Sequence, residues 1–132
     1  MNERVIPAPS VDAESRPFYE AAKQGRFLIR RCRACLRAHW HPRSLCPFCF
    51  GETEWSEASG EGEIYSYSIM RRTEPPYAIA YVKLAEGPTM LTNIVATPFD
   101  AIAVGKPVRL VLAPTGGYGP PVPCFRVVDS PT

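Results

Sequence analysis

Alternating apolar and polar positions mark five short segments in the C-terminal half of the chain. These segments are rich in Val, Ile, Tyr and Leu, and turn residues separate them, which is typical of β-strands. Five such strands predict a small barrel, and the pattern favours the Greek-key arrangement of an OB-fold. The predicted strands are residues 63–71, 77–84, 90–96, 107–113 and 123–128, with residues 98–104 as a short connecting turn or helix.

A helical pattern precedes these strands near the N-terminus. Ser15 followed by Pro17 predicts a helix start, and Gly25 ends the helix. Phe18 and Ala21 share one face of it, and this face either packs within the chain or contacts a partner. A strand at residues 27–31 follows the helix.

Four cysteines form two Cys-x-x-Cys pairs, Cys32 with Cys35 and Cys46 with Cys49, separated by ten residues. The two-residue spacer lets both sulfurs of a turn reach one ion at about 2.3 Å, so the pairs predict a zinc site. Because four thiolates leave no position for water or substrate, the zinc is predicted to be structural. The fragment CPFC also resembles half of a rubredoxin knuckle, which leaves iron open as an alternative.

These patterns together predict a mainly β protein with three parts: a short N-terminal helical segment (1–25), a zinc ribbon (26–59) and a five-stranded OB-fold barrel (60–132). The chain has 132 residues, of which 45% are hydrophobic, enough for a real core. It contains no apolar stretch of membrane-spanning length and no secretory signal, so a cytoplasmic protein without membrane association is expected. Reduced thiols suit that compartment. The fifth cysteine, Cys124, is predicted to be buried in a strand.

Charge is segregated along the chain. The formal net charge is +2, but four thiolates and one zinc ion bring the metal-loaded chain near zero, so no global field favours nucleic acid. Residues 21–51 carry seven cations and no acid, and five acids follow before the next cation. The cations either bind phosphates or offset the charge of the metal site. The cations are Lys23, Arg26, Arg30, Arg31, Arg33, Arg37 and Arg43; the acids are Glu52, Glu54, Glu57, Glu61 and Glu63.

Several aromatic and imidazole side chains lie beside these features. His39 and His41 flank Trp40 and are expected on one strand face as surface or packing residues rather than metal ligands. Trp55 is expected to pack under the ribbon. The Pro- and Gly-rich residues 114–123 predict a loop, in which Tyr118 either contacts a ligand or lies on a mobile surface.

The whole order of motifs resembles one known family. The stretches CRACxxxxxxPRxLCPFC, SGEGEIYSYSIM, YAIAYVKLAEGP, VGKPVRL and PVPCFRVV resemble the family called domain of unknown function 35 over nearly the whole chain. The resemblance implies a rubredoxin-like zinc ribbon fused to an OB-fold, with Cys32, Cys35, Cys46 and Cys49 as the metal ligands. Family members often place glycine directly after each Cys-x-x-Cys turn. This chain has Leu36 and Phe50 there, so looser knuckles are expected.

The resemblance also implies a function. Members are similar to accessory subunits, typically encoded beside thiolase-like enzymes or acyl-CoA hydratases, that dock on a thiolase-superfamily enzyme in a hetero-oligomer. The chain contains no recognisable nucleophile motif and no Walker or dinucleotide fingerprint, so no catalytic set is predicted. We therefore expect a non-catalytic subunit of an acyl-CoA thiolase or aldolase complex, whose helix and ribbon contact the enzyme. Arg30 and Arg31 are candidates to hold the phosphates of coenzyme A.

Two other functional classes remain open at this point. An OB-fold can bind single-stranded nucleic acid by stacking bases on aromatic residues. Tyr65 and Tyr67 are expected to share a strand face, where they either stack bases or fill the barrel core. The barrel cations are scattered, however, so nucleic acid is the less favoured partner. A rubredoxin-like electron carrier would require iron and would be coloured.

Overall fold

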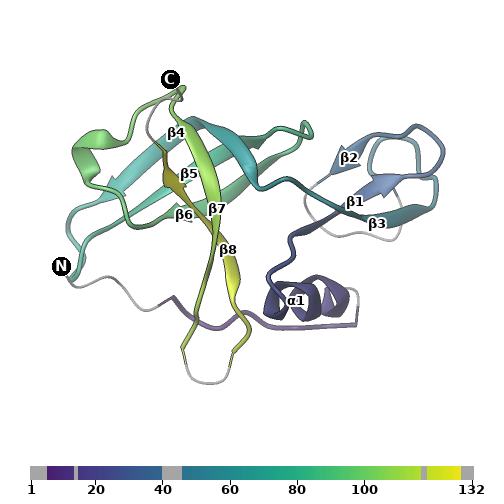
Figure 1. Ribbon diagram of the computed structural model, residues 1–132, viewed down its shortest axis with the longest axis horizontal. Coiled ribbons are helices and arrows are strands. Elements are labelled where there is room, and N and C mark those ends of the chain that lie inside the picture. Colours follow the sequence, from purple (N-terminus) through teal and green to yellow (C-terminus); the bar gives the residue numbers. More distant parts are fainter. Residues whose placement is uncertain (1–5, 14, 40–45, 117–118, 129–132) are drawn as a thin grey trace.

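The computed structural model describes residues 6–13, 15–39, 46–116 and 119–128. The described chain is mostly β-structure, with a short helix, a small three-stranded sheet and a closed barrel. Figure 1 shows the small sheet to one side of the barrel and the helix beneath their junction. The elements are α1 (Arg16–Lys23), β1 (Leu28–Cys32), β2 (Ala38–His39), β3 (Thr53–Glu57), β4 (Glu61–Met70), β5 (Tyr77–Leu84), β6 (Thr89–Ile94), the 3-10 helix η1 (Phe99–Ala101), β7 (Pro107–Ala113) and β8 (Val122–Val127).

Strands β4 to β8 close into a five-stranded barrel. Their order around it is β4-β5-β6-β8-β7, and β6 and β8 pair in parallel through Ile94 and Phe125 while the other pairs are antiparallel. This is the Greek-key order of an OB-fold, so the predicted fold is confirmed. The short helix η1 lies within the predicted connection at residues 98–104.

The small sheet has the order β2-β1-β3 with antiparallel pairing. Its pairing explains the segregation of charge along the sequence, because basic β1 lies beside acidic β3. Arg26 pairs with Glu57 at 3.0 Å, and Arg33 pairs with Glu54 at 3.5 Å. These side chains are about half exposed to solvent, so each pair contributes at most about 1 kcal/mol.

Helix α1 packs its apolar face within the chain. Phe18, Ala21 and Ala22 are buried, and the helix lies against β1 and β8. Asp12 and Ser15 exchange side-chain to backbone hydrogen bonds before the first turn, and Gly25 ends the helix region at a φ of 80°. The eight residues of α1 are far fewer than a bilayer requires, and no longer apolar helix occurs in the described ranges.

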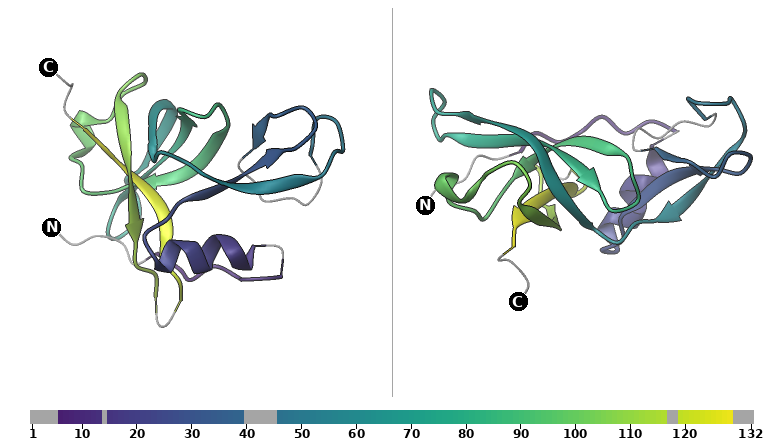
Figure 2. Two further views of the ribbon diagram at one scale, coloured as in Figure 1. Left: turned by 45° about the vertical axis from the view of Figure 1, so that its right-hand side comes forward. Right: turned by 90° about the horizontal axis from the view of Figure 1, so that it is seen from above.

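A chain of aromatic rings connects the helix, the ribbon and the barrel. Phe18 meets Phe27 edge to face at 6.2 Å between ring centroids, and Phe27 meets Phe125 of β8 at 6.3 Å. All three belong to one continuous buried cluster that extends into the barrel. Figure 2 shows α1, and the segment that leads from it into β1, beside β8 at this junction. The three parts therefore share one hydrophobic core.

This shared core predicts that the ribbon and the barrel unfold together. Replacing Phe27→Ala removes the central ring of the aromatic chain and should lower the free energy of unfolding by about 3 to 5 kcal/mol. In urea denaturation of the variant, tryptophan fluorescence and circular dichroism should report the same single transition, at a lower urea concentration than in the unaltered protein. Val104→Ala, at an exposed position, is the control and should leave the midpoint unchanged. Two separate transitions in the unaltered protein would contradict the shared core.

Candidate functional site

The four predicted ligands come together at one end of the ribbon. Their Sγ atoms all lie within 4.8 Å of one another, with Cys32 to Cys49 at 3.5 Å and Cys35 to Cys46 at 3.7 Å. A tetrahedral ion with bonds of about 2.3 Å would place its sulfurs about 3.8 Å apart. The arrangement therefore fits a four-cysteine metal site with no position left for substrate.

Backbone N–H groups prepare these sulfurs for a cation. The Cys35 and Ala34 N–H groups each donate to Cys32 Sγ at 3.3 Å. These hydrogen bonds, that of Cys35 first, outweigh burial and lower the pKa of the Cys32 thiol to about 6. For Cys49, the Gly51 N–H acts to lower the pKa, but the contact with Cys32 and burial raise it to about 11. A metal ion would displace the remaining protons.

Both knuckles keep closed turns without the expected glycines. Leu36 and Phe50 adopt positive φ angles of 65° and 62°, and their N–H groups bond to the Cys32 and Cys46 carbonyls at 3.1 and 2.9 Å. The expectation of looser knuckles is therefore wrong. Gly51 has a different role, because a Cβ there would lie 3.1 Å from Cys32 Sγ.

The structure sorts the ribbon arginines by their neighbours. Arg26 and Arg33 are paired with acids, as described above. Arg30 and Arg31 are adjacent on β1, so their side chains leave opposite faces of the strand. Arg30 lies over the Trp55 ring at 4.3 Å; Trp55 is part of β3, opposite Arg30 in the sheet, and packs partly buried against the core. A role of either arginine at the phosphates of coenzyme A stays a prediction.

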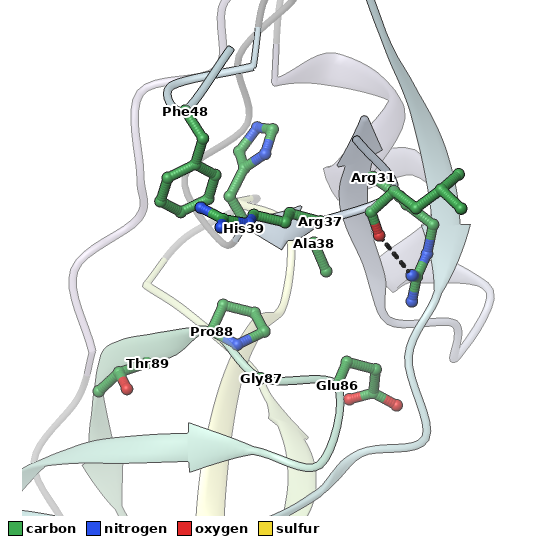
Figure 3. Close-up of a pocket in the computed structure, with 10 residues that line it drawn as sticks. Arg31, Arg37, Ala38, His39, Phe48, Glu86, Gly87, Pro88 and Thr89 are labelled. Carbon is green, nitrogen blue, oxygen red and sulfur yellow. Dashed lines mark hydrogen bonds between the residues drawn. The ribbon is translucent and has the colours of Figure 1, made fainter. Parts of the chain in front are cut away.

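Arg31 instead lines a cavity between the ribbon and the barrel, together with Arg37. The cavity has a volume of about 500 Å³. Figure 3 shows its ribbon wall, with Arg37 beside Phe48, facing the turn between β5 and β6. The Arg37 guanidinium lies 4.9 Å from the Phe48 ring centroid, and Arg31 donates to the Leu36 carbonyl at 2.8 Å. The remaining lining residues are Leu36, Ala38, His39, Glu86, Gly87, Pro88 and Thr89.

The cavity is electropositive on its ribbon side. Within the described residues, neither Arg31 nor Arg37 forms an ion pair. Glu86, the acid on the barrel wall, accepts a hydrogen bond from the Ser59 N–H at 2.8 Å. The arrangement can bind an anionic group beside an aromatic ring.

Sequence reasoning identified one wall of this cavity only in part. Arg31 was a candidate and Arg37 belonged to the basic run, but Phe48 and residues 86–89 carried no signal. His39 is a buried packing residue at the cavity, as expected, and lies opposite Arg30 in the sheet. Trp40, His41, Arg43 and Tyr118 lie outside the described residues.

The aromatic face expected on the barrel does not form as predicted. The register of β4 against β5 shifts around Tyr65, so Tyr67 lies opposite buried Ala80 while Ser66 lies opposite exposed Tyr81. A bulge of this kind breaks strict alternation, and Tyr65 and Tyr67 do not share a face. Both side chains are nevertheless exposed, at 67% for Tyr65 and 42% for Tyr67. Cys124 is buried in β8, as predicted.

Comparison with known proteins finds the same two parts in the same order. Residues 20–56 match a family described as "ChsH2, rubredoxin-like zinc ribbon domain", and residues 55–113 match "ChsH2, C-terminal OB-fold domain". Among solved structures, the chain is similar to one titled "Ltp2-ChsH2(DUF35) aldolase", with a TM-score of 0.78 and 34% identity. That similarity covers 90% of this chain and 98% of the other.

Two curated relatives extend the comparison. The chain is 39% identical over 111 residues to a "Probable enoyl-CoA hydratase alpha subunit" of Thermomonospora curvata, covering 79% of this chain and 34% of the relative. It is 32% identical over 89 residues to a "DUF35 domain-containing scaffold protein" of Methanocaldococcus jannaschii, covering 61% of this chain and 63% of the relative. The chain thus spans about a third of the length of the first relative and somewhat under two thirds of the length of the second.

The metal centre yields a direct prediction. Cys46→Ser removes one buried thiolate, so the chain should lose its metal and the ribbon should unfold, because metal binding and folding are coupled. Metal analysis and thermal denaturation measure the two effects. Cys124→Ser alters an equally buried cysteine outside the site and should retain the metal. Full metal content and an unchanged melting curve in Cys46→Ser would refute the assignment.

Proposed function

The chain belongs to the domain of unknown function 35 family, and on that premise we propose that it is a non-catalytic accessory subunit of a thiolase-superfamily enzyme. The observation that carries the proposal is the similarity to the solved "Ltp2-ChsH2(DUF35) aldolase", which extends over nearly all of that chain. The relatives called scaffold protein and enoyl-CoA hydratase subunit support the same class. The partner is a thiolase or an acyl-CoA aldolase, and the assembly is a hetero-oligomer.

The chemistry of the site supports a role without catalysis. Four thiolates fill the coordination shell of one ion, which leaves no open position for a reacting group. Among the described residues, the fifth cysteine and His39 are both buried in packing positions. The reaction is therefore assigned to the enzyme partner, and this chain supplies a rigid surface. Its reduced thiols suit the cytoplasm.

The ion is zinc with a structural role. Thiolate ligands also accept iron, but a closed site of this geometry needs no redox chemistry to serve an accessory subunit. The two metals are easily distinguished, because an iron centre with four thiolates colours the protein and zinc does not.

Coenzyme A is the proposed ligand of the cavity between the ribbon and the barrel. Its phosphates require cations, and Arg31 and Arg37 line the same cavity without ion pairs in the described chain. Phe48 lies beside Arg37 and offers a ring for stacking. Arg30, the other candidate from the sequence, is held over Trp55 and is assigned to packing. The acyl-CoA would then span this chain and the enzyme.

Complex formation is the first test of the accessory role. We expect this chain, co-expressed with the thiolase-like protein encoded beside it, to co-elute with that protein from a sizing column. Metal analysis of the shared peak should give one zinc per chain. Two separate peaks would reject the accessory role, and salt-sensitive binding of single-stranded DNA would then favour the nucleic-acid alternative.

The coenzyme A assignment has its own test on the assembled complex. Changing Arg31→Gln and Arg37→Gln together should weaken coenzyme A binding at least tenfold by calorimetry, because charge-assisted hydrogen bonds contribute about 1.5 to 3 kcal/mol each. Arg109→Gln changes an exposed barrel arginine and is the control. Zinc content should be unchanged in all variants. Wild-type affinity in the double variant would contradict the assignment.

A further inference from the structure

The two zinc knuckles share an unusual feature at the same position of each turn. Leu36 follows Cys35 and Phe50 follows Cys49, and both residues adopt the left-handed backbone conformation. Both side chains are highly exposed, at 64% for Leu36 and 77% for Phe50. Each turn therefore places a large apolar side chain in solvent from a backbone conformation that glycine adopts more easily.

This arrangement opposes the stability of the free chain. A residue with a Cβ is strained at positive φ, and glycine avoids this strain because it has no Cβ. Because the side chains of Leu36 and Phe50 are exposed, they bury little apolar surface and contribute little to the stability of the free chain. Because both effects disfavour Leu36 and Phe50 over glycine, their side chains contribute something other than the fold. Residues held in sparsely populated conformations are found preferentially at functional sites.

Neighbouring residues define the surface around these two tips. Phe48, in the second knuckle, is 55% exposed, and Arg37 lies over its ring. In the same knuckles, Arg33 is paired with Glu54 at 3.5 Å, whereas Arg37 forms no ion pair within the described residues. The surface thus consists of an apolar centre with the cation of Arg37 beside it.

We propose that Leu36, Phe48 and Phe50, here called the knuckle tips, are the surface by which this chain docks on its enzyme partner. The proposal deepens the accessory role and rests on it. The partner's docking face is an apolar hollow with a carboxylate at its rim, because such a face complements both the tips and Arg37 beside them.

Charge and shape separate this partner from other occupants. A second copy of the chain, docked tip to tip, would bring Arg37 toward the Arg37 of the other copy, and the two like charges would repel. A single-stranded nucleic acid would match the cations and could stack on the two phenylalanines, but Leu36 offers it no planar surface. An enzyme face with an apolar hollow uses all three side chains. The paired positions of Leu36 and Phe50 give such a contact two anchors.

The test uses substitutions that should improve the fold while removing the contact. In the double variant Leu36→Gly and Phe50→Gly, backbone strain is relieved, so the melting temperature of the free chain should be no lower than wild type. Zinc content should stay at one per chain. Binding to the neighbouring thiolase-like protein, measured by calorimetry, should weaken at least tenfold, as expected when two apolar anchors are lost.

A second variant and a control make the result specific. Leu36→Asn and Phe50→Asn keep a side chain that tolerates positive φ but remove the apolar surface, and should weaken binding similarly. Val104→Gly removes an exposed apolar side chain of the barrel and should bind as wild type. Wild-type affinity in the glycine double variant would overturn the docking surface while leaving the accessory role intact. If the unaltered chain fails to bind the enzyme, both proposals fail. Loss of zinc or a lower melting temperature in the glycine double variant would show that the tips serve the fold, and would also overturn the inference.

Discussion

The edge-to-face contacts of Phe27 with Phe18 and Phe125 hold the architecture together. A three-stranded ribbon of this size has too little apolar surface to fix its own orientation on a neighbouring barrel. By inserting Phe27 between the helix and β8, the chain merges the two parts into one buried cluster. The ribbon wall with Arg31 and Arg37 consequently faces the β5–β6 turn at a defined distance. The cavity exists because of that orientation.

The thiolate cluster provides the second constraint, within the ribbon. Its two turns bring Cys46 and Cys49 against Cys32 and Cys35 at the end of a small sheet, in which β2 has two residues and, in the described chain, pairs with β1 alone. The backbone N–H groups that point at Cys32 Sγ stabilise negative charge before any ion arrives. Gly51 shows how closely the second turn packs against the sulfurs, because any side chain there would crowd Cys32. The metal site thus fixes the knuckles, and the aromatic chain fixes the ribbon.

Most of the fold could be predicted from local sequence signals. The five barrel strands, the helix and the four ligands all follow from periodicity, turn residues and cysteine spacing, which act over a few residues. The bulge near Tyr65 could not be predicted, because strand alternation assumes an unbroken register. The barrel wall of the cavity, at Glu86 to Thr89, depends on packing between segments about fifty residues apart in sequence. By contrast, the placement of Arg30 and Arg31 on opposite faces of β1 follows from strand alternation and could have been predicted from the sequence.

The left-handed residues of the knuckles show what a departure from a family pattern can mean. From the sequence, Leu36 and Phe50 in place of glycine suggested a weaker turn. In the structure, the turns close with normal hydrogen bonds, and the cost is carried as local backbone strain. A chain that needed only a stable metal site would gain from glycine at both positions. An accessory subunit has a second requirement, because it must offer apolar side chains to another protein while remaining folded alone. Rigid turns anchored on a metal ion would meet both requirements of the proposed role, since the thiolates would hold the backbone in place while Leu36 and Phe50 stay exposed.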